Sequence, residues 1–248
     1  MNILKLKSIL FGLVAVLALS AVLTSCEQEA ILPDTDVEIT NDIEQFKSTT
    51  GNADGVQPSN TNITTPVLHH RFSGDISEEE AEAQWEAMVV GYISTLETTE
   101  IEERGVSTEW FYTIKTRTGT QTHNDTDGDV YSYITFATDK GTVTQGAWLN
   151  NFGNDREKGD WDAYFIRTYM PGQAVSWVEA RSGQLVLKGT DGWFPTDFDL
   201  HVHSGDQSIS ASGHSHFYTA PNVWLDNSTS SGWDYYVTGN VGYGRLNF

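Results

Sequence analysis

The chain has little cysteine and little positive charge. Its 248 residues include one cysteine and only 14 lysine and arginine residues. A single cysteine excludes a disulfide bond within the chain. The 34 acidic residues leave a formal net charge of −20, which disfavours nucleic acid and anionic bilayers as partners unless cations intervene.

The chain also lacks the common enzyme motifs. It contains no P-loop, no dinucleotide-binding fingerprint and no HExxH sequence. Residues 213–217 begin like a nucleophile elbow but end in Phe217 rather than glycine, and no strand-to-helix pattern surrounds them. We therefore expect a protein that is not an enzyme, and a small hydrolase is the least favoured alternative.

Two histidine pairs, His201-x-His203 and His214-x-His216, would each share one face of a strand. Four histidines suit zinc or copper, but no cysteine completes a site. The preferred interpretation is that these histidines are structural or exposed.

The N-terminus has the pattern of an export signal. Lys5 and Lys7 precede an apolar run at residues 9–23, which is short for a membrane span, so residues 1–25 are predicted to be a signal peptide. Residues 23–26, Leu-Thr-Ser-Cys, resemble the lipobox of bacterial lipoproteins, which implies lipid attachment at Cys26. We expect an exported lipoprotein of the bacterial cell envelope, at the outer membrane, with cell-surface display left open. A plain secretory signal with an incidental cysteine is the alternative.

Residues 26–66 are predicted to form a flexible acidic tether. They are rich in Asp, Glu, Thr, Asn, Gly and Pro, and they show no sustained apolar period. Such a tether would hold a folded module away from the bilayer.

Residues 67–105 are predicted to contain one amphipathic helix. Ser77 and Glu80 form a capping box. The apolar positions with helical spacing are Ala81, Trp85, Met88, Val89, Tyr92 and Leu96. The polar face is acidic, so we expect the helix to pack on the following domain rather than to bind a membrane. Gly91 is a weak point within it.

Residues 106–248 change to a period of two. Short apolar runs alternate with polar residues and are separated by Gly, Asn and Asp clusters. This spacing predicts an all-β domain, an antiparallel β-sandwich of about eight strands. Most of its aromatic residues are expected to pack in the core.

An acidic turn, residues 123–129, lies between two predicted strands. Its three aspartates repel one another, and a cation is a usual source of relief, so the turn predicts a calcium site. It is not an EF-hand, because counting from Asp125 places Val130 at the glycine position and Phe136 at the closing carboxylate position. A solvated hairpin tip is the alternative.

Further motifs follow in a characteristic order. They are a strand ending in Thr118-Gly119, Thr126-Asp127-x-x-Val130, Leu149-x-Asn151-x-Gly153-Asn154-Asp155, Gly159-x-x-Asp162-x-Tyr164, and a late Trp224-Leu225. This order resembles the PLAT (lipoxygenase homology) domain, in particular the calcium- and membrane-binding C-terminal domain of clostridial alpha-toxin. The resemblance covers roughly residues 109–239 and implies a PLAT-like β-sandwich.

The resemblance also implies calcium ligands. Thr126 and Asp127 match the family's Thr-Asp, and Asn154 and Asp155 match the Asn-Asp of the opposite loop. Together these residues would form one Ca²⁺ site with oxygen ligands.

A second calcium site of the family is less well matched. Its first aspartate falls on His123 and its glycine on Asp125, and imidazole is a poor calcium ligand. Asp125 and Asp197 could rebuild an equivalent site. Trp193 and Phe194 lie where the toxin has loop aromatics that enter membranes; burial is favoured for Trp193, and Phe194 is left open.

The expected function is that of an exported, lipid-anchored binding module. It would use calcium to engage lipid head groups, a membrane surface or a protein partner, and would not bind nucleic acid. The alternative is a carbohydrate-binding β-sandwich in which exposed tryptophans stack on sugars and calcium is structural.

Overall fold

The computed structural model describes residues 63–96, 106–149, 156–189, 191–204, 211–225 and 233–248. These ranges belong to one compact unit. The predicted signal peptide, Cys26 and most of the predicted tether lie outside them. No helix in these ranges is long and apolar enough to cross a membrane.

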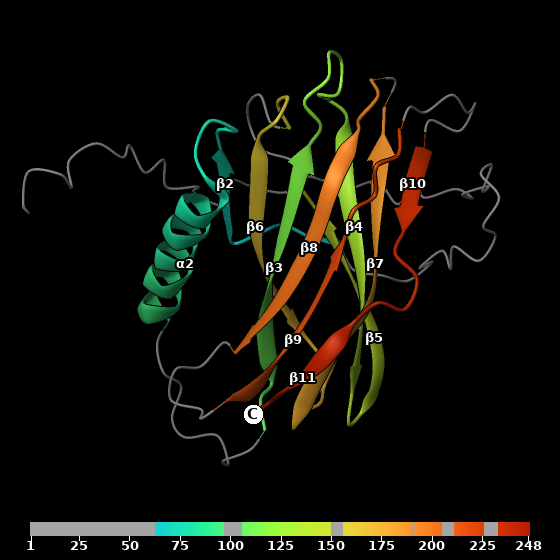
Figure 1. Ribbon diagram of the computed structural model, residues 1–248. Coiled ribbons are helices and arrows are strands. Elements are labelled where there is room, and N and C mark those ends of the chain that lie inside the picture. Colours follow the sequence, from blue (N-terminus) through green and yellow to red (C-terminus); the bar gives the residue numbers. More distant parts are fainter. Residues whose placement is uncertain (1–62, 97–105, 150–155, 190, 205–210, 226–232) are drawn as a thin grey trace, which may run out of the picture. The chain divides into compact units, whose positions relative to one another are not determined.

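The described part of the chain is an all-β sandwich with one helix (Figure 1). Its elements are β1 (Ile63–Thr64), β2 (Leu68–Phe72), α2 (Glu78–Thr95), β3 (Glu109–Thr118), β4 (Asp129–Thr138), β5 (Gly141–Trp148), β6 (Trp161–Tyr169), β7 (Trp177–Lys188), β8 (Pro195–Ser204), β9 (Ser212–Thr219), β10 (Trp233–Val237) and β11 (Tyr243–Asn247).

The strands form one curled sheet with the order β1-β5-β4-β7-β11-β9-β8-β3-β6-β2, and β10 pairs with β7. Every pairing is antiparallel except that of β1 with β5. The predicted fold class is confirmed.

The strand count and the start of the sheet differ from the prediction. The described residues form eleven strands rather than about eight. β1 comes from the stretch assigned to the tether, and β2 from the stretch assigned to the helical segment, so the sheet begins before residue 106. Both strands are too short to show a periodic pattern, and only pairing with distant strands defines them.

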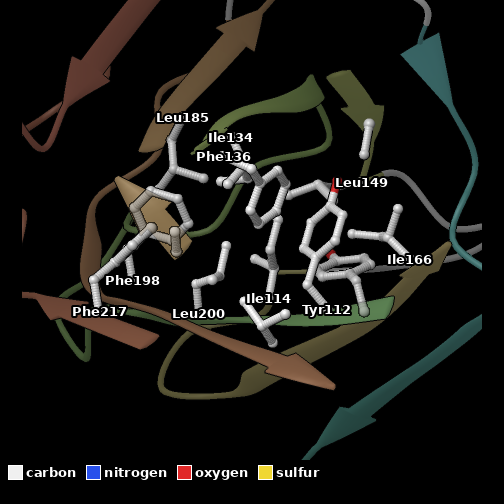
Figure 2. Packing of buried hydrophobic residues seen from close by; sticks show 14 of the residues in the cluster. Tyr112, Ile114, Ile134, Phe136, Leu149, Ile166, Leu185, Phe198, Leu200 and Phe217 are labelled. Carbon is white, nitrogen blue, oxygen red and sulfur yellow. The ribbon is translucent and has the colours of Figure 1, made fainter. Parts of the chain in front are cut away.

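The core lies between the two sides of the curled sheet (Figure 2). Alternate residues of β3, among them Tyr112 and Ile114, point inward and meet Phe136 of β4. Phe198 of β8 and Phe217 of β9 pack edge to face with ring centres 5.2 Å apart. All five side chains are almost completely buried. Each such burial stabilises the fold by about 1.5–3 kcal/mol.

Helix α2 covers the outer face of β2, β3 and β6. Trp85 and Val89 are buried in a second cluster with Phe111 and Phe165 of the sheet. β3 and β6 are therefore buried on both faces beneath the helix, which explains why Phe111 and Phe165 occupy positions that alternate with the inward ones. The N-cap half of the predicted capping box is present, because the Ser77 hydroxyl accepts the Glu80 N–H at 3.2 Å.

Gly91 is exposed within α2, and a Cβ there would meet no heavy atom within 4 Å. Gly91→Ala should therefore raise the free energy of unfolding by about 0.5–1 kcal/mol, because alanine loses less backbone entropy in a helix. Urea denaturation measures the change. The matched substitution Gly183→Ala should destabilise, since its Cβ would lie 2.6 Å from Cζ of Phe217. A destabilised Gly91→Ala variant would contradict this prediction.

Candidate functional site

The acidic turn between β3 and β4 is fixed by a second loop. The Thr126 hydroxyl donates to the backbone carbonyl of Asp191 at 3.1 Å and accepts the Gly128 N–H at 3.0 Å. The Asp127 N–H donates to Oδ2 of Asp191 at 2.9 Å. Thr126 is buried, whereas Asp127 and Asp191 are exposed. Buried Thr126 therefore anchors the turn, while the carboxylates of Asp127 and Asp191 face solvent.

Asp191 is a site residue that sequence reasoning missed. It brings another carboxylate to a turn that already carries Asp125 and Asp127. Its position follows from a contact between segments 64 residues apart. The local signal that could have found it is the Asp191-Gly192 pair just before Trp193, which is a common turn sequence.

Asn124 supplies a buried oxygen beside the turn. Its side chain is 1 % exposed, and its amide oxygen accepts no hydrogen bond from any described residue. Leaving a buried amide oxygen without a partner costs about 1–3 kcal/mol. Amide and carboxylate oxygens are the ligands that calcium takes, so Asn124, Asp127 and Asp191 fit this ion in kind.

The opposite loop is only partly described. The predicted ligands Asn154 and Asp155 lie outside the described residues. Within those residues, no group of three or more His, Cys, Asp or Glu side chains is placed to hold a metal ion. Arg156 begins the described chain again; it is buried, and its Nη2 donates to the Leu149 carbonyl at 2.5 Å. This hydrogen bond joins the residue that precedes the segment 150–155 to the residue that follows it.

Asp197 lies on β8, and hydroxyl groups hold its carboxylate. Thr196 donates to its Oδ2 at 2.9 Å, and Tyr218 donates to its Oδ1. The hydrogen bond to Asp197 raises the pKa of Tyr218 to about 12. Asp191 thus contacts the turn through a direct hydrogen bond. The Asp197 carboxylate instead accepts hydrogen bonds from Thr196 and Tyr218.

Trp193 is not a membrane contact. It has no exposed surface, and its Nε1 donates to the Thr118 hydroxyl at 3.0 Å. Two backbone hydrogen bonds of 2.8 Å join Trp193 to Leu225. Residues alternate in direction along an extended chain, so this pairing turns both of them inward and their neighbours outward.

The exposed aromatic residue near the turn is Trp224. It is 44 % exposed, and its ring lies 5.3 Å from the half-buried ring of Phe194. Val223, also exposed, precedes it. We name Phe194, Val223 and Trp224 the apolar tip. Sequence reasoning used Trp224 only as part of the Trp-Leu motif. No local pattern around Trp224 shows that its side chain is exposed while that of Trp193 is buried.

The apolar tip adjoins the acidic turn. The Phe194 N–H donates to the Asn124 carbonyl at 3.1 Å, and the Phe194 carbonyl accepts the Gly119 N–H at 2.9 Å. A Cβ at Gly119 would lie 2.9 Å from Cδ1 of Phe194, so a side chain there would displace the ring. One end of the sandwich therefore carries exposed carboxylates and exposed apolar side chains side by side.

Comparison with known proteins supplies structural neighbours but no sequence relatives. No protein-family model matches the chain, and no curated protein matches it in sequence. The alpha-toxin of Clostridium absonum is 18 % identical with a TM-score of 0.37, covering 56 % of this chain and 33 % of the toxin. Clostridium perfringens alpha-toxin is 15 % identical with a TM-score of 0.34, covering 68 % of this chain and 43 % of the toxin.

A coral 8R-lipoxygenase, described as calcium-activated through a C2-like domain, is 19 % identical with a TM-score of 0.34. The match covers 51 % of this chain and 16 % of that protein. The chain thus spans less than half the length of each of these neighbours. They are the two kinds of protein that the motif order resembles, and the resemblance is confirmed to that extent. At these TM-scores, the similarity by itself assigns no function.

Proposed function

We propose that the protein is an exported, lipid-anchored binding module that uses calcium to engage lipid head groups at a membrane surface. The observation that carries this proposal is the contact of the apolar tip with the acidic turn. The proposal assigns the chain no enzymatic activity.

The two surfaces have complementary roles in this proposal. Asp125, Asp127 and Asp191 would repel anionic head groups as well as one another. Bound calcium supplies positive charge and coordination positions that phosphate oxygens can share. Trp224 is suited to the boundary between acyl chains and head groups, because indole combines an apolar body with an N–H donor.

The proposed ligands combine both loops. Thr126, Asp127, Asn154 and Asp155 keep the roles implied by the family resemblance, and Asp191 and Asn124 join them on the geometry of the turn. The Thr126 hydroxyl already makes two hydrogen bonds that fix the turn, so Thr126 would contribute its backbone carbonyl. Calcium commonly takes backbone carbonyls alongside carboxylates.

Liposome co-sedimentation tests the proposal, using the full chain with Cys26→Ser so that no attached lipid contributes. Pelleting with vesicles containing phosphatidylserine should require calcium and fall about tenfold in Trp224→Ala, because burial of an aromatic side chain is lost. Tyr169→Ala is the matched control. Tyr169 is 50 % exposed and pairs with Glu109 at the start of β3, whereas the turn follows the other end of β3.

Pelleting that is unchanged by chelator and by Trp224→Ala would overturn the membrane proposal. A polysaccharide pull-down run beside it addresses the carbohydrate alternative. That alternative draws on Tyr218 and Tyr243, which are 59 % and 68 % exposed on β9 and β11. Retention on polysaccharide, lost in Tyr243→Ala and independent of vesicles, would favour it.

The proposed location is the outer membrane, with Cys26 as the lipid-bearing residue and the acidic tether between anchor and module. Cys26→Ser should leave a soluble or unprocessed protein, because the thiol that carries the lipid is missing. Fractionation with a high-salt wash measures this, and Ser25→Ala is the control. A Cys26→Ser protein that still fractionates with membranes after the wash would contradict the anchor.

A further inference from the structure

Four histidines form a row on the outer face of β8 and β9, which lie side by side (Figure 1). His201 of β8 pairs directly with His216 of β9. Ring centres are 4.8 Å apart for His201 and His203, 6.4 Å for His201 and His216, and 5.2 Å for His214 and His216. The strand register therefore places the two histidine pairs next to each other, although they are far apart in the sequence. We name these residues the histidine row.

His203 differs from the other three because its ring is engaged. The Thr113 hydroxyl accepts the Trp85 Nε1–H at 3.1 Å and forms a second hydrogen bond, of 2.9 Å, with Nε2 of His203. Burial lowers the pKa of His203 to about 3, which keeps the ring neutral. By contrast, the side chains of His201, His214 and His216 make ring contacts but no hydrogen bond or ion pair with any described residue.

Neighbouring charges leave the row open to a cation. Lys115, the nearest cation on β3, forms ion pairs with Glu82 and Asp199. Arg245 of β11 pairs in register with His214, but Glu179 holds its guanidinium. Carboxylates thus pair with the positive charges beside the row, and Glu179 is shared between Arg245 and Arg181.

The ring of Tyr243 lies edge-on to His216 at 5.5 Å and covers one flank of the row. His214 is exposed and His216 is half-buried, so both can be reached from solvent. A ligand bound there would be partly shielded on the β11 side.

We propose that the histidine row binds a late first-row divalent transition-metal ion, Zn²⁺ or Cu²⁺, through the imidazoles of His214 and His216. His201 lies beside His216 in the row, with ring centres 6.4 Å apart, and is not part of this two-histidine chelate. Imidazole nitrogens are preferred ligands for these ions, whereas calcium takes oxygen ligands. The site is thus separate in place and in chemistry from the acidic turn.

The spacing suits a chelate of two imidazoles. When each nitrogen is about 2.0–2.1 Å from one ion, the two ring centres lie roughly 5–6 Å apart. The ring centres of His214 and His216 are 5.2 Å apart, within that range, and the rings are stacked at 27°, so side-chain rotation is needed to direct one nitrogen of each ring at a shared ion. No three acidic, histidine or cysteine side chains of the described residues converge on one point, so water completes the coordination.

Equilibrium dialysis of the full chain with Zn²⁺ or Cu²⁺, in a large excess of Ca²⁺, tests this site. We expect one equivalent to bind and its affinity to fall at least about tenfold in His214→Ala and in His216→Ala, because a chelate becomes a single ligand. His123→Ala, an exposed histidine on the acidic turn, is the matched control and should bind as the wild type does. Electron paramagnetic resonance of the Cu²⁺ form should show couplings to two imidazole nitrogens in the wild type and to one in His216→Ala.

Equal affinity for Zn²⁺ or Cu²⁺ in the wild type and in His214→Ala would overturn the proposal. Competition by Ca²⁺ would also overturn it, because it would place the transition-metal ion at the acidic turn. The exposed position of His214 makes its variant decisive even if His216→Ala lowers the melting temperature. The assay contains no vesicles, and binding of Zn²⁺ or Cu²⁺ in it does not require calcium. Its result is therefore independent of the proposed membrane function.

Discussion

Trp85→Ala should lower the free energy of unfolding by about 3–5 kcal/mol, the range for deleting a large buried aromatic side chain. Trp85 is 2 % exposed and packs in the cluster between α2 and the outer face of β3 and β6. Its Nε1 also donates to the buried Thr113 hydroxyl at 3.1 Å. The substitution removes both the packing and this hydrogen bond, and the cavity would lie where the helix meets the sheet.

Chemical denaturation followed by circular dichroism measures the Trp85→Ala effect. Glu86→Ala, the next residue on the exposed side of the same helix, is the control and should change stability by less than about 0.5 kcal/mol. Trp85→Phe keeps most of the packing and loses the Thr113 hydrogen bond, so it separates the two contributions. A Trp85→Ala change below about 1 kcal/mol would show that the helix contributes little to the sandwich.

Calcium should raise the melting temperature of the wild type, and Asp127→Asn and Asp155→Asn should each remove most of the rise. Ligand at one hundred times its dissociation constant stabilises the folded state by about 2.7 kcal/mol. For a chain of this size that corresponds to roughly 5–10 °C. The physical reason is that exposed carboxylates from separate loops repel one another until a cation lies between them.

Thermal melts in calcium and in chelator provide the measurement. His123→Ala should retain the full calcium effect if Thr126, Asp127, Asn154 and Asp155 form the site. Glu86→Gln is a second control, because it removes a negative charge from helix α2 instead of from the turn. Asp191→Asn should also reduce the rise, since Asp191 meets the turn directly. Equal wild-type melting temperatures in the two buffers would return the turn to a solvated hairpin tip.

The membrane and metal proposals concern different surfaces of one scaffold. The apolar tip and the acidic turn share one end of the sandwich, where Phe194 bonds to Asn124. The histidine row occupies the outer face of β8 and β9, which helix α2 leaves uncovered. A calcium requirement at the first surface and a preference for Zn²⁺ or Cu²⁺ at the second would be independent, because the two ions select different donor atoms.

Several features could be predicted because they depend on residues close together in the chain. The helix N-cap needs only Ser77 and the Glu80 N–H, three residues apart, and it forms as expected. Periods of two and of helical spacing arise within single elements, so the all-β class and the buried positions Trp85 and Val89 follow from them. The acidic turn is likewise a local charge pattern.

Contacts between distant segments could not be predicted from local sequence patterns. β1 was assigned to the tether because two residues carry no period, and its pairing with β5 spans more than eighty residues of chain. The family resemblance favours burial of Trp193, but no local pattern shows that Trp224 is exposed. Their backbone pairing through Leu225 buries the first and exposes the second.

The sequence by itself determined the fold class, the capped helix and the acidic turn, since each is encoded in short-range period and charge. Only the tertiary structure decided that Asp191 meets Asp127, that the apolar tip adjoins Asn124, and that His201 pairs with His216. Strand register sets the histidine pair, and the other two contacts join loops that the sheet brings together. Register is chosen by the packing of the whole sheet, because a shift of one residue would turn every side chain to the opposite face.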